Sequence, residues 1–147
     1  MRVLRAMSLV AVAGFAAACE DTTGITVDDL VGTWNATKFE YTSAANSLIK
    51  FDMIQNGGGL TITVSAGGSY SGTVTLPGGL GTDSISGTFT IVNDTTLTRA
   101  ETGETPENYT FSLVGNTFTF TDTTEEFDFD FDGVDEDATL TVVLVRQ

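Results

Sequence analysis

The chain has 147 residues, of which 41% are hydrophobic and 18% are charged. One domain of this size buries about two thirds of its unfolded surface, so the chain can form a real core but not a second domain. With 20 acidic and 6 basic residues, its net charge of −14 repels phosphate backbones and anionic lipid headgroups. This charge disfavours nucleic-acid binding and electrostatic attachment to membranes.

The first residues are typical of an export signal. Arg2 and Arg5 precede an apolar run of eleven residues, 7–17, which is too short to span a bilayer but suits a signal-peptide core. The run ends at Ala16-Ala17-Ala18-Cys19, which resembles the bacterial lipobox, although Ala16 stands where that motif usually has Leu. The resemblance implies that Cys19, the only cysteine, is lipidated with acyl chains such as palmitate and anchors the protein in the bilayer. Ordinary cleavage after Ala-x-Ala, which would leave a free thiol, is the alternative.

These features divide the chain into three parts. We expect a signal peptide over 1–18, a lipidated cysteine with a flexible polar tether over 19–29, and one domain over 30–147. The resulting location is the bacterial cell envelope, on the periplasmic side or in the outer membrane.

The domain begins with a strand that contains the only tryptophan. The strand runs from Trp34 to Tyr41, and its apolar phase changes near Thr37, which predicts a bulge or bend there. Alternating Ile49, Phe51 and Met53 predict a second strand, although a helical turn fits these residues as well.

The rest of the domain alternates regularly between apolar and polar residues. Glycine or Asn/Asp turns close each run, and a second change of phase over 123–126 predicts a break or bulge. The apolar positions that define the strands lie within 60–65, 70–76, 85–91, 97–99, 109–113, 118–120, 127–131 and 140–145. This pattern predicts an all-β domain, an antiparallel up-and-down meander with one face of the sheet on a core.

Gly32-x-Trp34 at the head of such a meander resembles the signature of lipocalins and other calycins. The resemblance, which is to small lipocalin-like lipoproteins of bacterial envelopes, implies a closed barrel of about 8–10 strands whose Gly32 and Trp34 mark the closed end. It also implies an arginine packed on the tryptophan, which is either Arg146 or Arg99. A two-sheet sandwich would show the same alternation and remains the alternative.

Catalytic machinery is not recognisable in the sequence. The chain has no histidine, and the lipid on Cys19 would remove the only thiol. The glycine runs at 57–59 and 78–81 precede predicted strands rather than helices, so they do not fit a phosphate-binding loop. We therefore expect that the protein is not an enzyme.

Aromatic side chains recur on the apolar faces of the predicted strands. They either line a pocket for a small hydrophobic molecule or fill a small barrel, and the shortness of the chain favours a filled core. The candidate ligand cavity consists of Tyr70, Phe89, Tyr109, Phe111, Phe118, Phe120 and Phe129, with Phe127 and Phe131 in the same aromatic set.

The acidic segment 128–137 has a carboxylate at every second position and then a glycine, which resembles the opening of a calcium loop. Its twelfth position is Thr139 rather than Glu, and phenylalanines facing inward beside an Asp-Gly hairpin turn explain the pattern more simply. No cofactor is expected apart from this weak calcium candidate, whose ligands would be Asp130, Asp132, Asp135 and Asp137.

Two functions remain open at this stage. The first is a membrane-anchored, lipocalin-like lipoprotein that binds a small hydrophobic ligand in the envelope. The second is a structural or interaction module with a solid barrel, with or without calcium, that contacts another envelope protein.

Overall fold

The computed structural model describes residues 24–147. The predicted signal peptide, Cys19 and the first residues of the predicted tether lie outside the described residues. In the described part of the chain, no helix is long and apolar enough to cross a bilayer.

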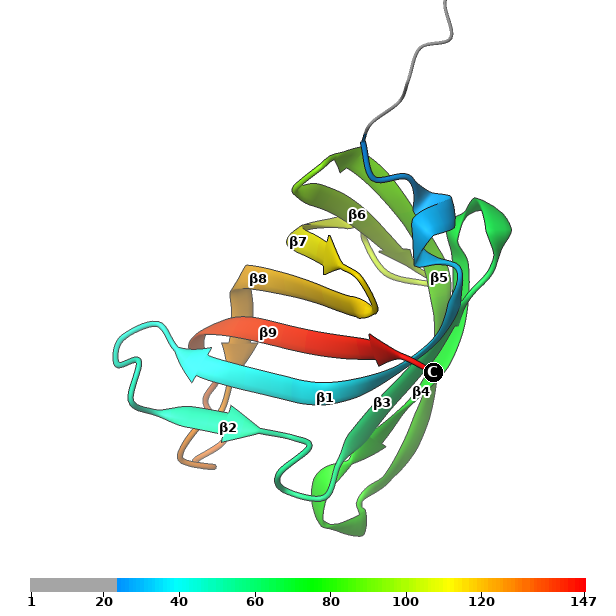
Figure 1. The fold of residues 1–147 in the computed structure, drawn as a ribbon. Coiled ribbons are helices and arrows are strands. Elements are labelled where there is room, and N and C mark those ends of the chain that lie inside the picture. The colour runs from blue at the N-terminus through cyan, green and yellow to red at the C-terminus, as the bar shows by residue number, and fades with distance from the viewer. Residues whose placement is uncertain (1–23) are drawn as a thin grey trace, which may run out of the picture.

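Eight antiparallel strands form a closed barrel (Figure 1). Each strand pairs with the next in the ring, and the last strand pairs with the first, which closes the sheet and rules out the sandwich. The strands of the ring are β1 (Gly32–Ser43), β3 (Gly59–Val64), β4 (Ser69–Leu76), β5 (Gly81–Asn93), β6 (Thr96–Glu101), β7 (Glu107–Val114), β8 (Thr117–Phe127) and β9 (Glu136–Arg146). The predicted all-β meander and barrel closure are therefore confirmed.

A ninth strand, β2 (Lys50–Asp52), lies outside this ring. It pairs with Glu40–Thr42 of β1, whereas β3 pairs with the first residues of the same strand. The single long strand β1 therefore carries two neighbours along one edge (Figure 1).

Both changes of phase in the sequence correspond to irregularities in strand pairing. The register between β1 and β9 shifts between Ala36 and Lys38. The register between β8 and β9 shifts between Asp122 and Glu125. Each shift returns the following residues to the inner face, so the predicted bulges are confirmed.

Two predicted strands are longer than the observed ones. The expected strand over 127–131 stops at Phe127, because the carboxylates of Asp128 and Asp132 accept backbone N–H groups of the following residues and form a loop instead. Phe131 has a φ of 58° in that loop. In the second predicted strand only residues 50–52 pair, while Ile49 and Met53 flank them.

The two ends of the barrel differ in structure. At one end the short 3₁₀ helices η1 (Val27–Leu30) and η2 (Ala66–Gly68) contact each other. Gly24, the first described residue, lies at the same end beside Asp94. The last residues of the predicted tether belong to this end, because Ile25 and Val27 pack against the core. The opposite end carries the β1–β2 loop, the turn after β2, η3 (Pro77–Gly79) and the 128–135 loop.

Candidate functional site

Trp34 closes the end of the barrel that carries η1. Its indole is fully buried, and its Nε1–H donates a hydrogen bond of 2.8 Å to the backbone oxygen of Leu30 in η1. Its ring meets Phe118 edge-on, with the ring centroids 5.7 Å apart. The helix and the indole together cover this end of the lumen.

Arg146 covers the outer side of the tryptophan. Its guanidinium carbon lies 4.3 Å from the centre of the Trp34 ring. Nη2 donates to the backbone oxygen of Asp29 at 2.6 Å, and Nη1 donates to the backbone oxygen of Val31. Gly32 has a φ of 141°, and a Cβ there would lie 3.1 Å from Nη1. Of the two candidate arginines, Arg146 is the one on the tryptophan, whereas Arg99 lies over Tyr109.

Six of the seven residues proposed for the ligand cavity form a packed core next to Trp34. Phe118 is fully buried and contacts Phe89, Phe111 and Phe120, with ring centroids 5.6 to 6.2 Å apart. Tyr70 stacks on Phe89 and Tyr109 meets Phe120 edge-on, and all six side chains are at most 6% exposed. Phe129 lies away from them, against Phe127. This half of the barrel is filled by side chains.

An apolar pocket of about 480 Å³ lies at the opposite end, the open mouth. The turn after β2, the β4–β5 connection and the end of β8 with its loop supply its walls. The lining residues are Phe51, Met53, Asn56, Leu76, Pro77, Gly78, Leu80, Phe127 and Phe131. Phe127 stacks on Phe51 at 5.0 Å and meets Phe131 edge-on at 6.4 Å, so one wall is aromatic.

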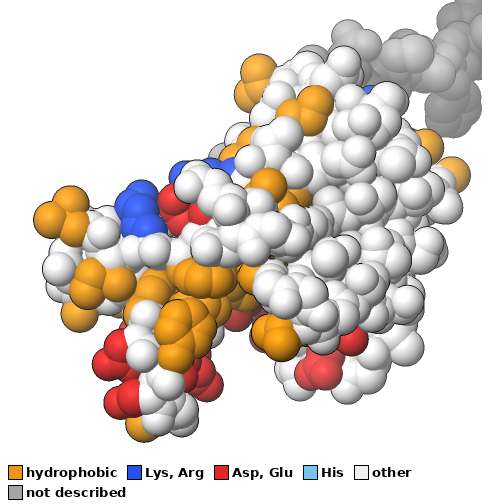
Figure 2. All heavy atoms as spheres, turned by 90° about the horizontal axis from the view of Figure 1, so that it is seen from below, with side chains coloured by type: hydrophobic (Ala, Val, Ile, Leu, Met, Phe, Trp, Pro, Cys, Tyr) orange, Lys and Arg blue, Asp and Glu red, His pale blue; other side chains and the backbone are white. Residues whose placement is uncertain are grey.

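Large apolar side chains are exposed on the loops around this mouth. Leu48 is 89%, Leu80 80% and Phe131 69% exposed, and Val134 is also exposed. Figure 2, seen from below, shows hydrophobic side chains gathered on this face with acidic side chains beside them. Exposed apolar surface around a concave site is typical of binding surfaces.

Charged side chains face the lumen between the packed core and the mouth. Arg99 and Glu101 follow the buried Leu97 on the same face of β6, and Arg99 pairs with Glu101 at 3.0 Å. On β7 and β8, the carboxylates of Glu107, Asp122 and Glu125 offer oxygens within 4.8 Å of one another. The Tyr109 hydroxyl donates to Glu107 at 2.8 Å. We call these five charged residues, Arg99, Glu101, Glu107, Asp122 and Glu125, the luminal cluster.

The electrostatics of the luminal cluster follow from burial and from like charges. Burial raises the pKa of Glu125, and the neighbouring Asp122 and Glu107 raise it further. Burial raises the pKa of Tyr41 to about 12, to which the Glu125 carboxylate contributes. Burial lowers the pKa of Arg99, but Tyr109, Tyr70 and the adjacent carboxylates outweigh it and raise that pKa above its ordinary value. The guanidinium is therefore held charged among acidic neighbours.

The acidic loop after β8 brings together a different set of carboxylates from the predicted one. Asp128, Asp130, Asp132 and Glu136 have oxygens within 4.8 Å of one another, whereas Asp135 and Asp137 lie outside this group. Several of the oxygens already accept backbone N–H groups, as in the 2.8 Å bond from Gly133 N to Asp128 and the 3.0 Å bond from Phe129 N to Glu136. The loop is built largely from these local side chain to backbone bonds.

None of the seven residues predicted to form the cavity lines the mouth pocket, although Phe127 and Phe131 of the wider aromatic set do. Leu80 and Phe131 lie in loops, and apolar residues in loops are the signal that could have identified the mouth. The luminal cluster could also have been predicted from the sequence. Arg99 and Asp122 lie two residues after the buried Leu97 and Phe120, and therefore on the same face of their strands.

Comparison with known proteins agrees with this architecture. A family model described as a lipocalin-like domain matches residues 30–120, which is more than half of the chain and includes the strands from β1 to the first part of β8. Neither the curated proteins nor the solved structures contain a significant match. The chain belongs to the lipocalin-like domain family.

Proposed function

We propose that the protein is an envelope lipoprotein, anchored through Cys19, that binds a small hydrophobic ligand in the mouth pocket and performs no chemistry on it. The observation that carries the binding function is the apolar pocket of about 480 Å³ at the open end, because ligand pockets fall in this range of volume and are mostly apolar. The filled half of the barrel next to Trp34 fixes the depth to which a ligand can enter.

The position of the N-terminus supports a specific orientation for the anchored protein. The backbone N–H of Ile25 donates to Asp94 at 3.3 Å at the closed end, and five residues separate Cys19 from Ile25. A chain spans at most about 3.5 Å per residue, so the anchor would hold the closed end near the membrane. The mouth would then point away from that bilayer, and ligands would enter from the aqueous side.

Removing two apolar walls of the mouth is expected to weaken ligand binding. The double variant Phe131→Asn with Leu80→Asn should raise the Kd for the neutral apolar dye Nile red by about tenfold, because it removes apolar area that the dye would cover. Asparagine also tolerates the φ of 58° at position 131, so the fold should be retained. Fluorescence titration of residues 20–147 measures the Kd and the number of dye molecules bound.

A matched pair of surface changes controls for a general loss of apolar surface. Val92 and Val114 are 58% and 74% exposed and lie beside the two hairpin turns at the closed end. The double variant Val92→Asn with Val114→Asn should leave the Kd unchanged. Equal binding by the wild type and the mouth variant would show that the dye binds outside the pocket, and the binding function would be wrong.

Anchoring through Cys19 is expected to depend on that one side chain. When the full chain is expressed in a bacterium fed with radiolabelled palmitate, the wild type should carry the label and fractionate with membranes. Cys19→Ser should be unlabelled and should lose its membrane association. A Cys19→Ser protein that remains in the membrane fraction would contradict the lipid anchor.

A further inference from the structure

The luminal cluster has more negative charge than the protein neutralises. Four carboxylates face one guanidinium, and among the described residues the only ion pair in the cluster joins Arg99 to Glu101. Within residues 24–147, Glu107, Asp122 and Glu125 have no lysine or arginine nitrogen within 4.0 Å. A carboxylate removed from water is costly unless a cation or hydrogen-bond donors accompany it. Asp122 accepts hydrogen bonds from the backbone N–H and the hydroxyl of Thr124, and the exposed Glu107 accepts one from Tyr109. Among the described residues, the half-buried Glu125 has no such donor and is the carboxylate left without compensation.

The other cations of the described chain are engaged elsewhere. Lys38 and Lys50 both lie beside Glu40, at 2.9 and 3.2 Å. Arg146 lies on Trp34 at the closed end. Among residues 24–147, Arg99 is thus the only cation in the luminal cluster, and a bound molecule could supply a second positive charge.

A second observation at the same place is the hydroxyl of Tyr70. Its side chain is 4% exposed, and its oxygen is buried without a hydrogen-bond partner among the described residues. Tyr70 lies opposite Gly87, which lies opposite Glu101, and a Cβ on Gly87 would be 2.9 Å from the hydroxyl oxygen. The hydroxyl is thus directed across Gly87 toward the Arg99–Glu101 pair. A buried polar group without a partner is uncommon in folded proteins and indicates an interaction that is still to be made.

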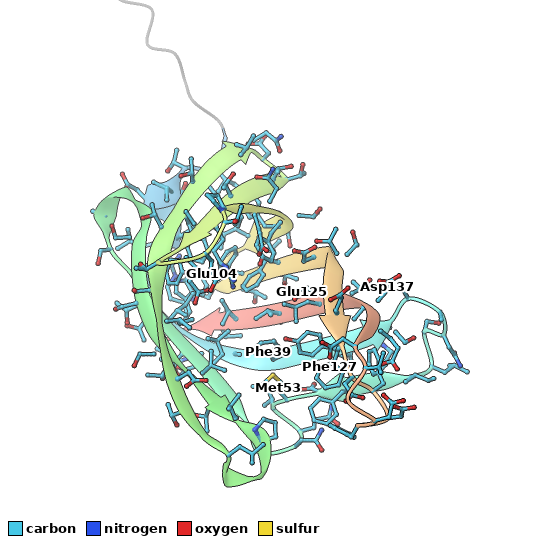
Figure 3. The ribbon with its side chains drawn as sticks, turned by 180° about the vertical axis from the view of Figure 1, so that it is seen from behind. Phe39, Met53, Glu104, Glu125, Phe127 and Asp137 are labelled. Atoms are coloured by element: carbon cyan, nitrogen blue, oxygen red, sulfur yellow. The ribbon has the colours of Figure 1, made fainter. Side chains whose placement is uncertain are left out.

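The luminal cluster is connected to the mouth pocket through Tyr41. The Tyr41 ring stacks on Phe127 with centroids 4.6 Å apart, and Phe127 lines the pocket. The charge of Glu125 also acts on the Tyr41 hydroxyl. Figure 3 shows Glu125, Phe127, Phe39 and Met53 around the same part of the lumen. An apolar body in the pocket would therefore have its inner end close to Glu125 and to Tyr41, an aromatic residue of the kind that attracts cations.

We propose that the ligand of the mouth pocket is an organic cation, an apolar molecule with one ammonium group that enters the lumen and pairs with Glu125. This inference rests on the proposed function, because it assigns the chemical class of ligand to the same pocket. The raised pKa of Glu125, which comes from its burial and from repulsion by Asp122 and Glu107, agrees with a site that gains from a bound positive charge.

Three probes with the same ten-carbon chain test the inference. Decylammonium, 1-decanol and decanoate carry positive, neutral and negative headgroups at pH 7. Calorimetry below their solubility or micelle limits gives each Kd for residues 20–147. We expect decylammonium to bind about tenfold more tightly than decanol, and decanoate to bind more weakly than either.

Two variants test whether the preference for decylammonium over decanol comes from the luminal cluster. Glu125→Gln should weaken decylammonium binding about tenfold and leave decanol binding unchanged. Because the pKa of Glu125 is raised in the folded state, the neutral glutamine should not lower the melting temperature. Glu126→Gln removes the same charge from an exposed neighbour and should alter neither Kd.

The outcomes separate this inference from the proposed function. If decanol binds and decylammonium gains nothing over it, the pocket is real and the headgroup assignment is wrong. If none of the three binds, the proposed function itself fails. If Ca²⁺ or Zn²⁺ binds in a manner that depends on Glu125 while decylammonium shows no preference, the carboxylates hold a metal ion, and the inference is overturned.

Discussion

Trp34→Ala is expected to lower the free energy of unfolding by about 4 kcal/mol, because replacing a large buried aromatic residue with alanine costs 3–5 kcal/mol. Trp34 is fully buried and holds Leu30, Phe118 and Arg146 at the closed end. Its loss also removes the Nε1–H donor from a carbonyl that is enclosed by the barrel end. Domains of this size are stable by only about 5–15 kcal/mol, so the variant should be close to unfolding at room temperature.

Two milder variants divide this loss into its parts. Trp34→Phe keeps most of the apolar volume but removes the hydrogen bond to Leu30, and we expect a loss of about 2 kcal/mol. Arg146→Met keeps the aliphatic stem but removes the cation from the indole and from the carbonyls of Asp29 and Val31, for a loss of about 1–2 kcal/mol. Urea unfolding followed by far-UV circular dichroism measures all three, since tryptophan fluorescence is lost in two of them. A loss below about 1 kcal/mol for Trp34→Ala would mean that the indole does not close the barrel.

Most of the fold could be predicted from the sequence, because each strand of a barrel has a pattern that can be recognised within its own few residues. Alternation with a period of two identified the strands, and each change of phase marked a bulge, at Thr37 and again within 123–126. The strand predicted to run through Phe131 was wrong because strand alternation and a run of Asp-stabilised turns both repeat at every second residue. Only the hydrogen bonds of the Asp side chains distinguish the two.

The candidate site could be predicted less well. Alternation shows which residues face inward, but it does not show the depth at which each one lies inside the barrel. Phe118 and Phe127 both face inward, yet one is fully buried beside Trp34 and the other lines the mouth. Depth depends on which strand ends meet, and this is set by the register between strands distant in sequence. The charges of the luminal cluster, in contrast, are in phase with core residues, so the alternation of apolar and polar residues alone places Arg99 and Asp122 on the inner face.

Gly72→Ala is expected to lower the free energy of unfolding by about 3 kcal/mol, although alanine is normally the better residue in a strand. Glycine in a strand interior is ordinarily destabilising by about 0.5–1 kcal/mol relative to alanine, and Gly72 has no positive φ that would require it. Here the Cβ of any residue would lie 2.2 Å from the backbone oxygen of Thr61 and 2.8 Å from the Ile62 side chain. The backbone of β3 cannot move without breaking its pairing to β1 and β4, so the cost of overpacking exceeds the gain in propensity.

The neighbouring position provides the control for this steric argument. Ser71 is exposed on the outer face of the same strand, and Ser71→Ala creates the same residue at a position that already accommodates a Cβ. We expect that variant to remain within about 0.5 kcal/mol of the wild type, as measured by urea unfolding. An equal or greater stability for Gly72→Ala would contradict the close approach of β3 to β4. It would also remove the explanation for glycine at the inward-facing positions 72 and 87, where a Cβ would meet a backbone oxygen of the adjacent strand.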